Sequence, residues 1–166
     1  FDWDGIKALE NGRLRFAGTA PSHLFFAMRE GLKMLMEEGL DNVFARHARL
    51  AEATRCAVRA WGRGNGPTLY GRDDASLSNS VTAVRMPDGF DANVFRGKVL
   101  SESNVALGGG LSRLSGTVFC IGHLGDLNEP MILGCLATVE MQLRRQGIPH
   151  GEGGVDAAVA YLAETR

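Results

Sequence analysis

The 166-residue chain is 45% hydrophobic and 22% charged, which is ordinary for one globular domain and argues against disorder. Its net charge of -1 leaves no positive excess for nucleic acid or an anionic membrane surface, and no apolar run approaches the roughly 20 residues that a membrane-spanning helix needs. The cysteines, Cys56, Cys120 and Cys135, form no CxxC pair, so the sequence predicts neither disulfides nor a thiolate zinc site and favours a cytoplasmic protein.

The first half of the chain carries the patterns of two helices. Apolar residues recur at three- and four-residue steps over 22–38, which predicts an amphipathic helix that ends at Gly39. Asp41 is a candidate N-cap for a second helix that runs to Trp61. The residues expected on its inner face are Phe44, Ala48, Ala51, Val58 and Trp61. Those expected mostly on its outer side are Arg46, Arg49, Arg55 and Arg59.

The first helix also carries a stripe of large apolar residues. These are Phe25, Phe26, Met28, Met34 and Met36. A stripe at helical spacing is more often core than cofactor pocket, and in a piece of a longer protein part of it would be an interface to another domain.

Residues 63–79 should form a flexible surface loop, because they are rich in glycine and small polar residues. A phosphate-binding role for these glycines is disfavoured, since no helical pattern follows them.

The second half alternates strands with helices. The expected elements are a strand at 81–86, a helix capped by Asp91 and running to about 102, a strand around 104–107, a glycine loop, a strand at 117–121, and helices at 128–146 and 155–164. Asn128 is a candidate N-cap for the long helix. This order predicts an α/β fold in which helices cover a small sheet.

Polar residues give only weak indications of a site. The four histidines are scattered, and no second ligand pair accompanies Cys120 and His123 at zinc-like spacing, so a metal site is not expected. His123 and Asp126 follow the 117–121 strand, where turn and capping roles are favoured over a role in a cleft.

Four segments carry a resemblance to a known family. They are residues 37–62, 80–100, 118–130 and 148–162, the third reading VFCIGHLGDLNEP. In order and spacing they resemble the C-terminal domain of fold-type I, class V aminotransferases that use pyridoxal phosphate (PLP), most closely the serine-glyoxylate and alanine-glyoxylate enzymes. The resemblance implies a small domain at 22–166 with a mostly antiparallel sheet, preceded by an inter-domain and dimer-contact segment at 1–21.

The family transfers an amino group from a small amino acid, such as serine or alanine, to a 2-oxo acid such as glyoxylate, and works as a homodimer. Its Schiff-base lysine and pyridine-binding aspartate lie in a large domain upstream of the matched region. Lys7, Lys33 and Lys98 stand in unlike contexts, so none is assigned as that lysine. Because the chain also begins at Phe1, we expect a piece of a longer protein that is inactive without the large domain.

Two positions remain as candidate site residues by resemblance. Thr19 matches a threonine that helps hold the PLP phosphate of the partner subunit; the alternative is that Thr19 only begins the helix. The tyrosine expected nearby falls at Phe16 or Gly18, neither of which has a hydroxyl. Cys120 stands where the family has the arginine that grips the substrate carboxylate; the alternative is a small buried strand residue.

These departures leave a second interpretation open. A non-catalytic α/β interaction or remnant domain would be free to lose the arginine at Cys120 and the phenolic hydroxyl, because no chemistry would depend on them.

Overall fold

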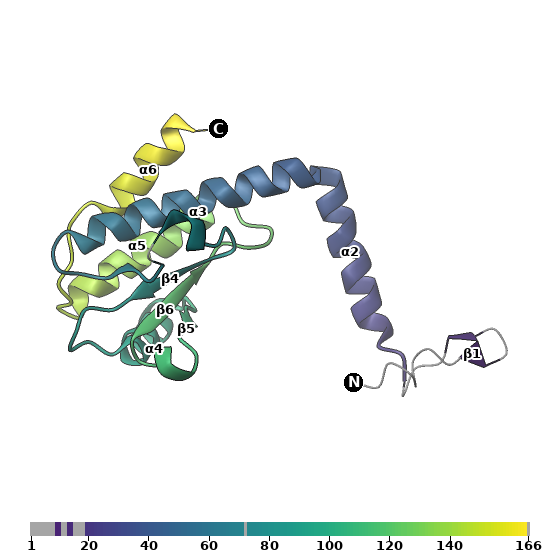
Figure 1. Cartoon of the computed structure of the whole chain (residues 1–166), viewed down its shortest axis with the longest axis horizontal. Helices are drawn as coiled ribbons and strands as arrows, with labels where there is room; N and C mark the ends of the chain where they lie inside the picture. The colour runs from purple at the N-terminus through teal and green to yellow at the C-terminus, as the bar shows by residue number, and fades with distance from the viewer. Residues whose placement is uncertain (1–8, 11–12, 15–18, 72, 166) are drawn as a thin grey trace. The chain divides into compact units, whose positions relative to one another are not determined.

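A computed structural model describes residues 9–10, 13–14, 19–71 and 73–165 (Figure 1). The chain divides into two compact units, residues 1–43 and 44–166. Lys7, Phe16 and Gly18 lie outside the described residues.

The first unit holds a short hairpin and one long helix. Strand β1 (Leu9–Glu10) pairs antiparallel with β2 (Arg13–Leu14). Helix α2 (Ser22–Glu38) follows and ends as predicted at Gly39, whose φ of 85° suits a residue without a Cβ. The next helix begins at Leu40, so Asp41 lies in its first turn and the prediction of Asp41 as N-cap was wrong.

The apolar stripe of α2 is exposed in this structure. None of the residues of α2 is buried. The large exposed side chains are Leu24, Phe25, Phe26, Met28, Leu32, Met34, Leu35 and Met36. The stripe is therefore not core within the first unit, and the alternative of an interface to another domain stays a prediction.

The second unit is built on a four-stranded antiparallel sheet, which confirms the predicted fold class. Its strands are β3 (Thr68–Leu69), β4 (Val81–Arg85), β5 (Gly108–Gly109) and β6 (Val118–Gly122). They lie in the order β3-β4-β6-β5, with every neighbouring pair antiparallel.

Two strands differ from the sequence-based expectation. Strand β3 falls inside 63–79, which was expected to be a loop without strands. The strand expected at 104–107 is instead β5, at Gly108–Gly109, because Asn104 adopts the left-handed conformation that ends the preceding helix.

Four helices supply the rest of the core (Figure 1). They are α3 (Leu40–Gly62), α4 (Ala92–Ser103), α5 (Glu129–Arg145) and α6 (Gly154–Glu164). Two other predicted N-caps are confirmed: the Asp91 side chain accepts from the amides of Asn93 and Val94, and that of Asn128 accepts from the amide of Met131. Among the described residues, no helix is both long enough and apolar enough to cross a membrane.

One face of the sheet packs on these helices, and we call it the helix face. Val84 of β4 pairs with Phe119 of β6, and both are fully buried. Phe119 lies 5.2 Å, between ring centroids, from Phe95 of α4. Because side chains alternate along a strand, Ile121 faces the same way and Cys120 faces the opposite way.

Three helices meet at Trp61, near the end of α3. Its indole Nε1 donates to Glu140 Oε2 of α5 at 3.0 Å, and the same oxygen accepts from the amide of Val155 in α6 at 3.0 Å. A Cβ on Gly154 would lie 2.0 Å from Trp61 Nε1, so only glycine allows this approach of α6. Trp61 is buried as predicted, whereas Phe44, expected on the same inner face, is exposed.

Candidate functional site

Cys120 lies in the middle of β6, on the side of the sheet opposite the helix face. Its neighbours across the strands are Ala83 and Gly108. A Cβ on Gly108 would lie 3.0 Å from Cys120 Cβ, so a larger residue there would crowd the cysteine. A Cβ on Gly122, the next residue on this side, would meet nothing within 4 Å. We call this group of small residues, Ala83, Gly108, Cys120 and Gly122, the open face.

The residue at position 120 on the open face is short and neutral. Cys120 is half-buried. Burial raises the pKa of the Cys120 thiol, although the positive charge of Arg96 acts in the opposite direction. A neutral thiol cannot form the paired, charge-assisted hydrogen bonds that a guanidinium makes to a carboxylate.

His123 directly follows β6 on the side of the helix face and is fully buried. The carbonyl of Asn79 can only accept, so His123 Nδ1 donates to it at 3.0 Å, and Nε2 of the neutral ring accepts from the Thr82 hydroxyl at 2.8 Å. Burial lowers the pKa of His123. His123 therefore fastens the strand end and does not face a cleft, while Asp126 in the following turn is exposed.

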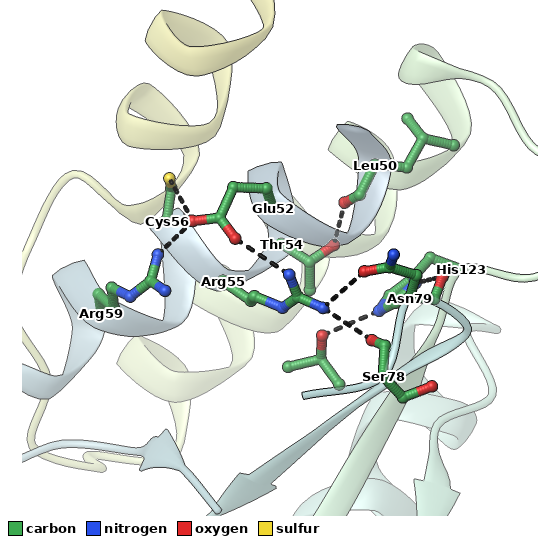
Figure 2. A network of polar contacts seen from close by, with 10 residues as sticks. Leu50, Glu52, Thr54, Arg55, Cys56, Arg59, Ser78, Asn79 and His123 are labelled. Carbon is green, nitrogen blue, oxygen red and sulfur yellow. Dashed lines mark hydrogen bonds and ion pairs between the residues drawn. The ribbon is translucent and has the colours of Figure 1, made fainter. Parts of the chain in front are cut away.

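Arg55 of α3 joins the same buried region, where sequence reasoning did not place it. Its guanidinium donates to the Ser78 carbonyl at 2.8 Å, to Asn79 Oδ1 at 3.0 Å and to Glu52 at 3.1 Å (Figure 2). Arg55 is only 8% exposed, which corrects the expectation that it lies on the outer side of its helix. The apolar part of its side chain can pack inward while the guanidinium reaches buried polar atoms. The spacing of residues along a helix does not indicate such distant partners.

Two other α3 residues hold the turn that follows His123. Arg46 Nη1 donates to the carbonyls of Gly125 and Leu127 at 2.9 and 3.0 Å. His47 Nε2 accepts from the amide of Gly125 at 3.0 Å. Arg46 is half-buried and His47 is buried, so this side of α3 is a contact surface for the turn.

Arg49 extends this contact surface to α5 and α6. It is paired with Glu129 at the start of α5 and donates to the carbonyls of Leu162 and Thr165 at the end of α6. Arg59, in contrast, is exposed as predicted and pairs with Glu52.

The remaining sequence candidates lie on exposed surfaces. Thr19 is exposed just before α2, and Lys98 is exposed on α4. Lys33 is exposed on α2, where it pairs with Glu30 and Glu37 at 3.5 and 3.7 Å. Within the described ranges, no three His, Cys, Asp or Glu side chains gather as metal ligands would.

Comparison with known proteins decides the family. No family model matches the chain. The serine-glyoxylate aminotransferase of Methylorubrum extorquens is 44% identical over 165 residues, covering 99% of this chain and 40% of that protein. The serine-glyoxylate aminotransferase of Arabidopsis thaliana is 43% identical over 164 residues, covering 98% of this chain and 40% of that protein. The crystal structure of pyridoxamine-pyruvate aminotransferase from Mesorhizobium loti matches with a TM-score of 0.81 at 28% identity, covering 90% of this chain and 38% of that one.

The chain belongs to the class V aminotransferases. It spans about 40% of the length of the two curated relatives, in their C-terminal part. The resemblance found in the sequence is thereby confirmed.

Aminotransferases of this class depend on PLP, so we tested whether the described residues could hold it. A PLP enzyme needs a lysine amine that reaches the cofactor aldehyde from within a closed site. Lys33 and Lys98 are both exposed, and Lys33 is occupied by two carboxylates. The described residues therefore do not form a PLP site by themselves, and the cofactor would need residues from elsewhere in the protein.

Proposed function

We propose that this chain is the C-terminal small domain of a PLP-dependent aminotransferase that transfers the amino group of a small amino acid, serine or alanine, to a 2-oxo acid such as glyoxylate. The observation that carries the proposal is the match at 44% and 43% identity to two serine-glyoxylate aminotransferases over nearly the whole chain. The likeness to the pyridoxamine-pyruvate aminotransferase structure supports the same class of reaction.

In this role the open face closes one side of the substrate cleft, and the large domain supplies the PLP lysine. The cleft side must bind a carboxylate, and by resemblance position 120 does so. The small neighbours of Cys120 support this assignment, because Ala83 and Gly108 would leave space for an arginine there. With the neutral thiol, two charge-assisted hydrogen bonds of roughly 1.5–3 kcal/mol each are missing. We therefore expect weak binding of the substrate carboxylate.

A chimaera tests this proposal. The matched 40% of the Methylorubrum extorquens enzyme is replaced by this chain, and the product is compared with the chain alone. We expect the chimaera to bind PLP, with an absorbance band near the visible edge that borohydride removes, and to transaminate serine with glyoxylate. The chain alone should show neither property. A chimaera that folds and binds PLP but does not transaminate, even after Cys120→Arg, would contradict the proposal.

A non-catalytic interaction or remnant domain is the second candidate, and Cys120 is the observation that favours it. Such a domain would keep the fold and lose the carboxylate-binding residue. The two candidates differ in the response of the chimaera to Cys120→Arg. If the chain is an aminotransferase domain, the substitution should increase transamination, whereas a remnant domain should not respond.

We further propose a homodimer in which Thr19 contacts the PLP phosphate of the partner subunit. The exposure of Thr19 before α2 supports this role. In the chimaera, Thr19→Ala should raise the dissociation constant of PLP about 10-fold, as expected for the loss of one hydrogen bond to a charged group. Unchanged PLP affinity would leave Thr19 as a helix-entry residue only.

We also propose a cytoplasmic location. The cysteines Cys56, Cys120 and Cys135 are all free thiols and all partly buried, which suits a reducing compartment. Expression of the chain fused to a fluorescent protein, followed by fractionation, tests this location.

A further inference from the structure

The turn between β6 and α5 is held by one arginine and two histidines. It comprises residues 123–127, and we call it the β6–α5 turn. Arg46 of α3 donates to the carbonyls of Gly125 and Leu127, and His47 of α3 accepts from the amide of Gly125. At the start of the turn, His123 is fastened to Asn79 and Thr82. Two buried histidines thus bind one short turn.

The hydrogen bond at Gly125 requires a neutral histidine. A backbone N–H can only donate, so His47 Nε2 must carry a free lone pair to accept it at 3.0 Å. When His47 takes up a second proton, both ring nitrogens become donors and two N–H groups face each other. That contact cannot persist, and the amide of Gly125 must turn away.

His123 reinforces this requirement, because its surroundings also disfavour a charged ring. It is fully buried. The charged or titratable groups that act on it come from α3: the positive charge of Arg55 and the nearby His47 both disfavour its protonation. Glu52 neutralises part of the charge of Arg55 (Figure 2). From the sheet side His123 meets the neutral Thr82 hydroxyl, and from the preceding loop it meets the Asn79 carbonyl.

The other charges near the turn do not replace the two histidines. Arg46 contacts the turn only through backbone carbonyls and keeps its charge at any pH of interest. Asp126, the acidic residue of the turn itself, is exposed. A fall in pH therefore acts on the two rings and leaves the arginine contacts unchanged.

We propose that the β6–α5 turn is an acid-releasable latch, held closed by the neutral rings of His47 and His123 and opened when these rings are protonated. Opening releases the amide of Gly125 and the start of the turn, between the end of β6 at Gly122 and the N-cap of α5 at Asn128, while the contacts of Arg46 remain. The latch is a property of this fold and does not depend on the proposed activity.

Amide hydrogen exchange of the whole chain tests the latch. Protection factors, which are corrected for the intrinsic exchange rate, are measured at pH 7.5 and pH 5.5. We expect the protection of Gly125 in the wild type to fall at least about 10-fold, as for the loss of one hydrogen bond of about 1.4 kcal/mol. His47→Gln places a non-titrating acceptor near the position of Nε2, so the fall should be much smaller in that variant.

His150→Gln is the matched control, because His150 is half-buried and contacts the carbonyl of Ile148 outside the turn. It should behave like the wild type. A constant Gly125 protection factor in the wild type, or an equal fall in His47→Gln, would overturn the proposal.

A second measurement covers the case in which His47→Gln fails to fold. The ring of His47 and the amide of Gly125 are followed together by NMR in the wild type as the pH is lowered. The latch predicts one shared midpoint for the two signals. Midpoints separated by more than one pH unit would overturn it.

Discussion

The two faces of the sheet in the second unit differ in what surrounds each side chain. On the helix face, Phe119 and Ile121 are enclosed by helices, and His123 at the strand end has hydrogen-bond partners for both ring nitrogens. On the open face, Cys120 has only small neighbours across the strands, Ala83 and Gly108. Packing therefore constrains the side chains of the helix face closely, whereas it constrains position 120 on the open face much less. This difference explains how a chain with 44% identity to an aminotransferase can keep the fold while a proposed substrate-binding residue differs.

The largest expected effect is on the helix face. Phe119→Ala removes a fully buried ring that packs on Phe95. We expect the free energy of unfolding to fall by about 3–5 kcal/mol, which is the usual cost of such a cavity. Urea denaturation followed by circular dichroism measures it. A loss below about 1 kcal/mol would show that the helix face is not the constrained side.

A second large effect is expected where three helices meet. Glu140→Gln removes the carboxylate that accepts from Trp61 and Val155 and pairs with Arg144. Because these are hydrogen bonds to a charged group, we expect a loss of about 2–3 kcal/mol. Burial alone would raise the pKa of Glu140, but its hydrogen bonds and Arg144 lower it below 4.5 overall. The stabilisation should therefore be present above pH 4.5 and disappear as the pH falls below that value, which a denaturation series on wild type and variant would reveal.

The third effect concerns His123 on the helix face, and it appears in how the free energy of unfolding depends on pH. Its pKa is lowered from 6.5 in the folded chain, so the unfolded state binds more protons below about pH 6.5. Stability should be constant with respect to this group above pH 6.5 and fall as the pH drops, by at most about 1.4 kcal/mol per pH unit. Thr82→Val removes the hydroxyl partner without adding a charge and should leave this slope in place. If the pH dependence of the free energy of unfolding is unchanged in His123→Gln, then a group other than His123 causes it.

The smallest effect is expected on the open face. Cys120→Ala should change the free energy of unfolding by less than about 1 kcal/mol, because the side chain is half-buried and small. It is the matched control for Phe119→Ala, since the two residues are neighbours in one strand. A large loss in Cys120→Ala would mean that the open face is also constrained by packing.

The sequence predicted the features that depend on residues close together in the chain, and it missed those that depend on residues far apart. The ends of helices at Gly39, Asp91 and Asn128 were predicted correctly, because a cap depends on residues within one turn. Strand β5 was missed because two glycines carry no alternating pattern. Its pairing with β6 is a tertiary contact.

The candidate site shows the same division. Position 120 was identified by resemblance, and its placement in the central part of β6 follows the predicted strand. The inward course of Arg55 was not predicted, because its partners Ser78 and Asn79 lie 23 and 24 residues away in sequence. The roles of His47 and Arg46 were missed for the same reason, since they contact a turn that lies 78 or more residues further along the chain.

The most direct test of the account is the kcat/KM of the chimaera for serine and glyoxylate before and after Cys120→Arg. If the open face retains the frame of a carboxylate site, the substitution should raise kcat/KM about 100-fold, equivalent to roughly 2.7 kcal/mol of transition-state stabilisation, mainly through a lower KM. An unchanged kcat/KM in a chimaera with intact PLP binding would contradict the account and favour the non-catalytic interaction or remnant domain.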